Sequence, residues 1–273
     1  MEIAPLIHSR TFYCDFNQNF AVRPDDLNVQ WATNKILPAM RDVDILNGVR
    51  RVVATDGKIC IAGVACNFRY FVENYLSTNE QTTAENYLRD ERGRDVKIFL
   101  GYAFKGNGVP DVSDSKLWQM FEQYLAPEWN RQTVETVIAP YENCGVKNVS
   151  GKPVDKKFYA SGERDDLELF EQCLAEHKNF CSNVDAVKIF DSGAYEIISA
   201  PQSVINRLQS EAQKKTPQQQ PTHQDKADKV TEQSFQARRN QNMKSTPSKG
   251  NSTPLIIGVV AVVILVIIFL VIK

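Results

Sequence analysis

An uninterrupted apolar segment constrains this chain more than any other feature of its sequence. Residues Leu255 to Ile272 read LIIGVVAVVILVIIFLVI and include no charged side chain and no side chain that forms hydrogen bonds. A helix rises about 1.5 Å per residue, so the segment would be roughly 27 Å long, close to the ~30 Å hydrocarbon core of a bilayer. The pattern predicts a transmembrane helix over residues 254–272, with the lipid bilayer as its partner.

Two other structures compete with a transmembrane helix. A buried core helix or strand would be flanked by folded segments, whereas a polar tract precedes this segment and Lys273 alone follows it. The tail of a GPI-anchored precursor would require a signal peptide at the N-terminus, and Met1 to Arg10 (MEIAPLIHSR) has no basic start and no long apolar run. We therefore expect a single-pass, tail-anchored membrane protein whose N-terminal domain stays in the cytoplasm.

Charge is distributed unevenly along the chain. Residues 206–253 carry nine Lys or Arg and four acidic residues, whereas residues 1–205 carry 22 basic and 29 acidic residues. A basic flank is what the positive-inside rule predicts for the cytosolic side, and an acidic domain disfavours nucleic acid as a partner. The basic residues fit either a soluble tether or a contact with anionic lipid. The candidates for lipid contact are Arg238, Arg239, Lys244 and Lys249.

The tract before the apolar segment has the composition of a disordered linker. Between Thr216 and Thr253 the only large apolar residues are Val230, Phe235 and Met243, too few to offset the entropy of ordering. This tract also lacks the apolar heptads of a SNARE helix. We expect a cytosolic globular domain at 1–205, a basic linker with a helical start at 206–253, and the transmembrane helix at 254–272.

Within the globular domain, strand-like segments come in close pairs. The strongest signal is a hairpin of Arg51 to Thr55 and Lys58 to Ala65, because Asp56-Gly57 accepts the backbone angles of a two-residue turn. Cys60 and Cys66 would then share the core face of one strand. Further predicted strands are a pair at 184–190 and 194–199, a pair at 11–16 and 20–23, and a central strand at 96–104 that is apolar on both faces.

Helical periodicity fills the intervals between these strands. Asp26 to Met40 places apolar residues on one stripe, with Pro38 expected to bend or end the helix. The other predicted helices are 68–76, 114–125 after the cap Ser113, 165–177 starting at Asp165, and 202–213. Hairpins combined with helices predict an α+β fold with an antiparallel or mixed sheet.

Few residues in the domain suggest a chemical reaction. Cys173 and His177 are four apart in a predicted helix, with Cys181 four further, so a thiolate–imidazolium nucleophile is one interpretation. Packing of Cys173 in the core, with His177 facing solvent, is the other. Asp111 and Asp114 are a weaker pair that fits a metal ligand set or a helix start. We assign no metal site and no cofactor.

These observations favour an interaction domain over an enzyme. Six cysteines at irregular spacing fit free thiols in a reducing cytosol. We expect a membrane-tethered α+β domain that presents an acidic surface to a cytosolic protein partner for interaction or signalling. The alternative is a tethered hydrolase or transferase with a site near Cys173 and His177 or near Asp111 and Asp114.

Overall fold

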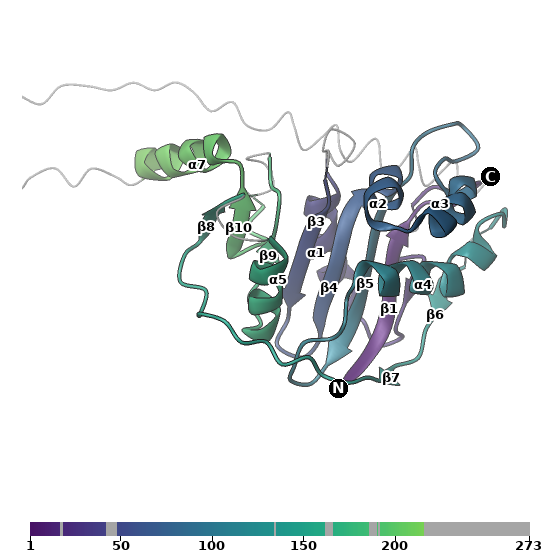
Figure 1. Cartoon of the computed structure of the whole chain (residues 1–273), viewed down its shortest axis with the longest axis horizontal. Helices are drawn as coiled ribbons and strands as arrows, with labels where there is room; N and C mark the ends of the chain where they lie inside the picture. The colour runs from purple at the N-terminus through teal and green to yellow at the C-terminus, as the bar shows by residue number, and fades with distance from the viewer. Residues whose placement is uncertain are drawn as a thin grey trace, which may run out of the picture. The chain divides into compact units, whose positions relative to one another are not determined.

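The computed structural model describes residues 1–16, 19–41, 48–133, 135–161, 166–185, 190 and 192–215. Its described residues belong to one compact unit, Met1–Gln218, with an α+β architecture in which helices pack on a mixed sheet (Figure 1). The predicted disordered tract and transmembrane segment lie outside the described residues. Among the described helices, none is long and apolar enough to cross a membrane.

The sheet has ten strands in the spatial order β6-β2-β1-β5-β4-β3-β9-β10-β8, with β7 also paired to β1. Its middle is antiparallel, whereas β6–β2, β9–β10 and β10–β8 are parallel pairs. The strands are β1 (Glu2–Ser9), β2 (Val22–Arg23), β3 (Arg50–Thr55), β4 (Cys60–Asn67), β5 (Lys97–Lys105), β6 (Val137–Ile138), β7 (Glu142–Asn143), β8 (Phe158–Ala160), β9 (Phe180–Cys181) and β10 (Ile197–Ala200).

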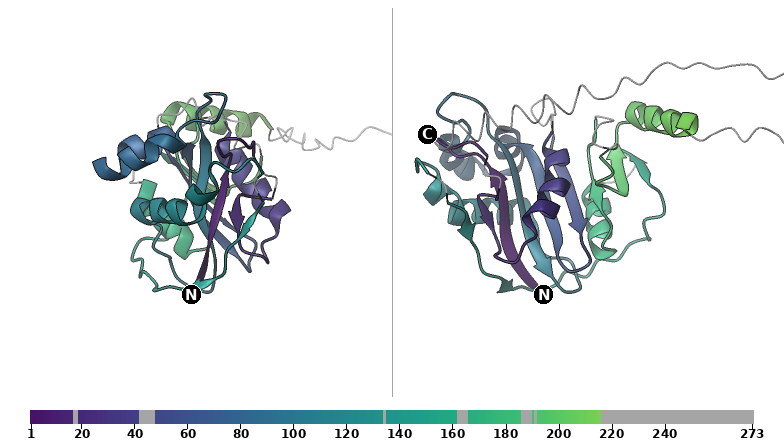
Figure 2. Two further views of the ribbon diagram at one scale, coloured as in Figure 1. Left: turned by 90° about the vertical axis from the view of Figure 1, so that its right-hand side faces the viewer. Right: turned by 180° about the vertical axis from the view of Figure 1, so that it is seen from behind.

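Helices cover both faces of the sheet, as the two opposite views in Figures 1 and 2 show. Five helices (α1, α2, α4, α5 and α7) start and end within a few residues of the predicted bounds, and the short helix α3 was not predicted. The helices are α1 (Val29–Met40), α2 (Phe68–Tyr75), α3 (Thr78–Ala84), α4 (Asp114–Tyr124), α5 (Asp166–Ala175) and α7 (Gln202–Lys215), with 3-10 turns at Glu85–Tyr87 and Ala126–Glu128.

Two hydrophobic clusters lie on opposite faces of the sheet. Along β5, Ile98, Leu100 and Phe104 belong to one cluster, while Phe99 and Ala103 belong to the other. This alternation follows from the two-residue period of a strand. The first cluster, which we call the aromatic face, includes side chains of α2, α4 and α5. The second, the α1 face, includes side chains of α1 and the start of α7.

The predicted central hairpin is confirmed, but its turn is shifted by one residue: Asp56 N–H donates to the Ile59 carbonyl at 3.3 Å, so Gly57 and Lys58 rather than Asp56 and Gly57 form the turn. Strands β3 and β4 pair antiparallel from Arg50↔Ala65 to Thr55↔Cys60, and the Asp56 carboxylate accepts hydrogen bonds from the backbone N–H groups of Lys58 and Ile59, both at 2.8 Å. Gly57 has a φ of 87°, which glycine adopts without strain. Cys60 and Cys66 share the core face, as predicted. Strand β5 is central and buried on both faces.

Both other predicted hairpins are wrong in their pairing. Strand β2 does pair antiparallel, but with β1 (Ile7↔Val22), and the described residues 11–16 contain no strand. Strand β10 begins three residues after the predicted start and ends one residue after the predicted end, and it pairs parallel with β9 and β8. Its predicted partner at 184–190 lies partly outside the described residues, and Val184–Asp185 is not a strand. Strand β1 also pairs antiparallel with β5 along its whole length, from Glu2↔Lys105 to Ser9↔Ile98.

A buried arginine fixes the C-terminal end of α1 against the sheet. Arg50 on β3 is fully buried, and its guanidinium donates to the carbonyl oxygens of Ala39 at 2.8 Å and of Arg41. It also forms an ion pair of 2.7 Å with Asp185. Pro38 lies in the last turn of α1, which ends at Met40. These contacts satisfy carbonyl groups that a helix end leaves without partners.

Candidate functional site

The Cys173 and His177 pair predicted from the sequence does not form one helical face. Helix α5 ends at Ala175, and His177 lies in the following turn with a φ of 53°. Cys181 lies on β9 rather than on the same helix. The Cys173 side chain is buried in the hydrophobic cluster that also holds Leu169 and Leu174, which agrees with the packing interpretation. Predicted helical spacing failed here because the chain turns after Ala175.

Asp111 and Asp114 also have separate roles. Asp111 is exposed and accepts a hydrogen bond of 3.1 Å from the backbone N–H of Ser113. Asp114 begins α4 and faces Arg51 at 3.8 Å, an ion pair that is too long for a hydrogen bond. Burial raises the pKa of Asp114, and the Arg51 charge opposes that rise. Among the described residues, no group of three or more His, Cys, Asp or Glu side chains is placed to hold a metal ion.

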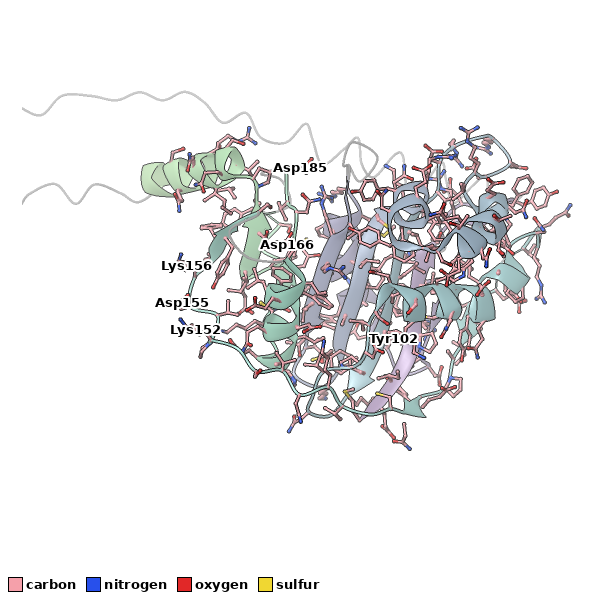
Figure 3. All side chains as sticks on the ribbon, in the orientation of Figure 1. Tyr102, Lys152, Asp155, Lys156, Asp166 and Asp185 are labelled. Atoms are coloured by element: carbon pink, nitrogen blue, oxygen red, sulfur yellow. The ribbon has the colours of Figure 1, made fainter. Side chains whose placement is uncertain are left out.

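A cavity of about 760 Å³ lies beside Asp111, between α4 and the segment 142–147. Tyr102 on β5 lies beneath α4 (Figure 3), and its hydroxyl donates to the Lys116 carbonyl at 3.2 Å. Burial and the negative charge of Asp111 raise the pKa of Tyr102 to about 12. This hydroxyl is therefore protonated and already partnered.

A second hollow, of about 920 Å³, lies on the α1 face, and we call it the α1 groove. One side of α1 forms one wall, through Val29, Thr33 and Leu37. The segment after β1 forms the other wall through Phe16, and the end of β1 contributes His8 and the nearby Arg10. The three helix residues are four apart, so helical periodicity alone aligns them along the groove.

Three residues that line the groove each have one buried polar atom without a hydrogen-bond partner: Nδ1 of His8, Nε of Arg10 and Oγ1 of Thr33. His8 is 4% exposed, and its ring packs on Phe16 and Phe20 with centroid distances of 5.2 and 4.9 Å. Burial lowers the pKa of His8 to about 4, so the imidazole is neutral near pH 7. Each buried polar group without a partner lowers the stability of the folded state by about 1–3 kcal/mol. The residues that line this groove carry three such groups.

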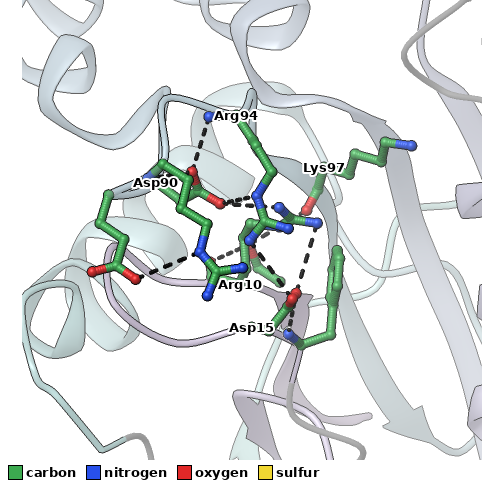
Figure 4. A network of polar contacts seen from close by, with 9 residues as sticks. Arg10, Asp15, Asp90, Arg94 and Lys97 are labelled. Carbon is green, nitrogen blue, oxygen red and sulfur yellow. Dashed lines mark hydrogen bonds and ion pairs between the residues drawn. The ribbon is translucent and has the colours of Figure 1, made fainter.

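Arg10 is held by a paired network at the rim of the groove (Figure 4). Its guanidinium donates to Asp90 at 3.0 Å, lies 3.7 Å from Asp15, and stacks over the Phe16 ring at 4.9 Å. Arg94 donates to Asp90 at 2.7 Å. Burial opposes ionisation of Asp90, but hydrogen bonds from the Arg94 backbone, the Arg94 side chain and Arg10 lower its pKa to about 2. The network orients Arg10 while leaving its Nε unpartnered.

The sequence contained weak signals for this groove. His8 is one of three histidines in the chain and lies near the end of β1, yet the sequence analysis considered Met1 to Arg10 only as a possible signal peptide. Asp90 and Arg94 are four apart, but Arg10 is 80 residues away from Asp90 in the chain. Comparison of the chain with protein-family models, with curated proteins and with solved structures found no match.

Proposed function

We propose that the chain is a single-pass membrane protein in which residues 254–272 cross the bilayer. In this proposal the α+β domain is a cytosolic interaction or signalling module. The observation that carries the proposal is the run of eighteen apolar residues from Leu255 to Ile272. Burial of such side chains in lipid is favourable by about 0.3–0.6 kcal/mol for each Leu, Ile, Val or Phe at a helix centre.

Confinement is the physical benefit of this arrangement. Treated as a random coil, the 38 residues from 216 to 253 have a root-mean-square reach of about 35 Å. A domain held within that distance of a membrane meets other membrane-bound proteins at a raised effective concentration. The nine basic residues of 206–253 support a cytosolic side, and Arg238, Arg239, Lys244 and Lys249 are the proposed contacts with anionic lipid.

Membrane extraction tests the transmembrane segment. We expect the full chain to stay in the membrane pellet after a carbonate wash, and a variant with Val263→Arg and Ile264→Arg to move to the supernatant. Each arginine at a helix centre costs about 2.5–3.5 kcal/mol of insertion free energy. The matched control Lys249→Arg keeps the flank charge and should stay in the pellet. Full chain found in the supernatant would contradict the proposal.

Thiol reactivity separates the interaction module from a cysteine-dependent enzyme. In the structure Cys173 is fully buried, whereas Cys14 and Cys144 are half-exposed. We expect a thiol reagent at neutral pH to modify Cys14 and Cys144 in the folded protein and to reach Cys173 only after denaturation. Rapid modification of Cys173 in the folded protein would favour the hydrolase or transferase alternative instead.

A further inference from the structure

We propose that the end of the domain formed by β8 and α7 docks on an anionic lipid leaflet, and that docking turns the acidic remainder of the domain towards the cytosol. The inference rests on the proposed transmembrane segment, which brings the domain to the bilayer. It concerns a different part of the chain, the folded residues 148–160 and 202–215. Three observations carry it: the distribution of charge, three exposed lysines without a described acidic partner, and the position of these lysines in the fold.

Charge is polarised between this end and the rest of the domain. Residues 148–160 and 202–215 together contain six Lys or Arg and two acidic residues. The other residues of 1–215 contain 19 basic and 28 acidic residues. An anionic leaflet attracts the first set and repels the second, so its field favours one orientation of the domain.

Three lysines beside β8 form an exposed surface, which we call the β8 patch. Lys152, Lys156 and Lys157 are all exposed, and Figure 3 shows Lys152 and Lys156 at the outer edge of the domain. Lys157 Nζ lies 4.7 Å from the centroid of the Phe190 ring, and Lys156 Nζ lies 5.9 Å from that of Tyr159. These rings hold the two lysine side chains in place without removing their charge.

No patch lysine forms an ion pair with a described carboxylate. The neighbouring Asp155 instead accepts a hydrogen bond of 3.3 Å from the Tyr159 hydroxyl. Lys178, which lines the same hollow as Lys156, is paired with Glu176 at 2.7 Å. Three acidic residues of this part of the sequence lie outside the described residues: Glu163, Asp165 and Asp191. The charge of the patch is therefore not compensated by the described part of the domain.

The patch lies where the chain leaves the domain for the membrane. Among the described strands, β8 is the last at its end of the sheet, and α7 packs against it (Figure 2). The linker at 216–253 continues directly from α7. The patch can therefore touch the leaflet without the linker passing around the domain.

The transmembrane segment makes a weak attraction sufficient. Each lysine close to an anionic leaflet strengthens association about fivefold, which is too little for three lysines to recruit a protein from the cytosol. A domain that is already held within a linker length of the bilayer meets the leaflet at a high effective concentration. Under that condition the β8 patch has only to orient the domain.

Lysine footprinting of the full chain in lipid vesicles tests the docking. The chain is incorporated into phosphatidylcholine vesicles, or into vesicles that also contain phosphatidylserine, and flotation confirms its incorporation. A membrane-impermeant reagent then acetylates the exposed lysines. We expect Lys152 to be acetylated about threefold more slowly, or slower still, on the anionic vesicles, and this protection to disappear in high salt. Lys58, exposed in the β3–β4 turn, should react at the same rate on both.

Two charge-matched variants locate the contact, with Lys152 as the reporter in both. The first combines Lys156→Glu with Lys157→Glu in the β8 patch. The second combines Arg89→Glu with Arg92→Glu in the segment before β5, where these side chains are 63% and 69% exposed. Both variants change the net charge by the same amount. We expect the protection of Lys152 to be lost in the first variant and kept in the second.

Three results would overturn the inference. The first is equal acetylation of Lys152 on the two kinds of vesicle, which would leave the β8 patch to an acidic protein instead. The second is protection that survives in the first variant or is lost equally in both variants. The third is that Lys58 is protected as much as Lys152, because the effect would then not be specific to the patch. If the first variant does not fold, Lys156→Gln with Lys157→Gln decides by the same criteria.

Failure of the transmembrane segment gives a different result. A chain without such a segment would not float with phosphatidylcholine vesicles. The acetylation of Lys152 is then compared between chain bound to anionic vesicles and chain in free solution, and the same criteria decide the docking. A chain that floats with neither kind of vesicle contradicts both proposals.

Discussion

The two faces of the sheet are packed in different ways. On the aromatic face, the rings of Phe68, Trp118 and Phe121 pack together with centroids 4.8–6.3 Å apart, and these side chains are fully buried. On the α1 face, one side of α1 lies beside a hollow of about 920 Å³, and three of the residues that line it (His8, Arg10 and Thr33) each have one buried polar atom without a hydrogen-bond partner. The aromatic face also has a cavity, of about 760 Å³ beside α4, and it buries the unpartnered Nε1 of Trp118, so the two faces differ mainly in the density of their aromatic packing.

Truncation of the aromatic face should have the largest effect. Phe121 contacts four aromatic rings, and Phe121→Ala removes a fully buried side chain, so we expect the free energy of unfolding to fall by about 3–5 kcal/mol. Leu37→Ala in the groove wall should cost less than about 1 kcal/mol because Leu37 is 40% exposed. Urea denaturation followed by fluorescence measures both. If the two variants lose the same free energy of unfolding, the two faces do not differ in how strongly their packing stabilises the fold.

Removal of the Asp90 carboxylate should have the next largest effect. Asp90→Asn leaves the largely buried Arg10 with a weaker partner, and we expect a loss of about 3 kcal/mol in unfolding free energy at pH 7. Arg94 is 44% exposed, so Arg94→Gln should cost less than about 1 kcal/mol. The pKa of Asp90 is lowered to about 2, so its stabilisation is present above the ordinary value near 4 and is lost as pH falls towards 2. Similar losses of unfolding free energy in Asp90→Asn and Arg94→Gln would contradict the inference that the buried Arg10–Asp90 pair contributes more than the exposed Arg94.

The groove should make stability depend on pH through His8. The folded pKa is about 4 against an ordinary value of 6.5, so the unfolded chain binds a proton in this window and the folded chain does not. As pH is lowered from 6.5 to 4, we expect the free energy of unfolding to fall by about 2–3 kcal/mol because of His8. Above pH 6.5, His8 should not make the free energy of unfolding depend on pH. The variant His8→Gln should lose this dependence, and His177→Gln should keep it. If His8→Gln keeps the same pH dependence of the unfolding free energy as the wild-type protein, His8 is not the group that causes it.

The smallest expected difference compares two threonines. Thr136 donates from its hydroxyl to the Phe20 carbonyl at 3.0 Å, whereas the Thr33 hydroxyl has no partner. Thr136→Val should therefore lower the unfolding free energy by about 1 kcal/mol, while Thr33→Val should leave it unchanged or raise it slightly. Thermal unfolding at one pH measures the pair. Destabilisation of Thr33→Val beyond that of Thr136→Val would mean that the hydroxyl is already satisfied.

Local pattern predicted several elements correctly. The Asp56-Gly57 dipeptide between two β-branched runs gave the central hairpin, and 3.6-residue periodicity gave α1, α2, α4 and the last helix within a few residues. These elements depend on neighbours in the chain. Strand β1 was missed because Pro5 and His8 interrupt its apolar pattern, and its eight residues are held by pairing with β5, about ninety residues away in the chain.

The candidate sites show the same division. Cys173, His177 and Cys181 are equally spaced in the sequence, and that spacing suggested one helical face. The chain turns after Ala175, so the equal spacing does not place the three side chains on one helical face. The α1 groove was not predicted, because it brings together His8, Thr33 and Lys97 from three segments that share no motif.

The sequence by itself determined the apolar segment at 255–272, the division of charge, the α+β class, the central hairpin and most of the helices, since each follows from composition or from the period of a few residues. Tertiary structure alone decided which strands pair in parallel, how Arg10 meets Asp90, and which buried polar atoms are left without partners. The physical reason is that hydrogen bonds and burial are satisfied across long distances in the chain, where local periodicity carries no information.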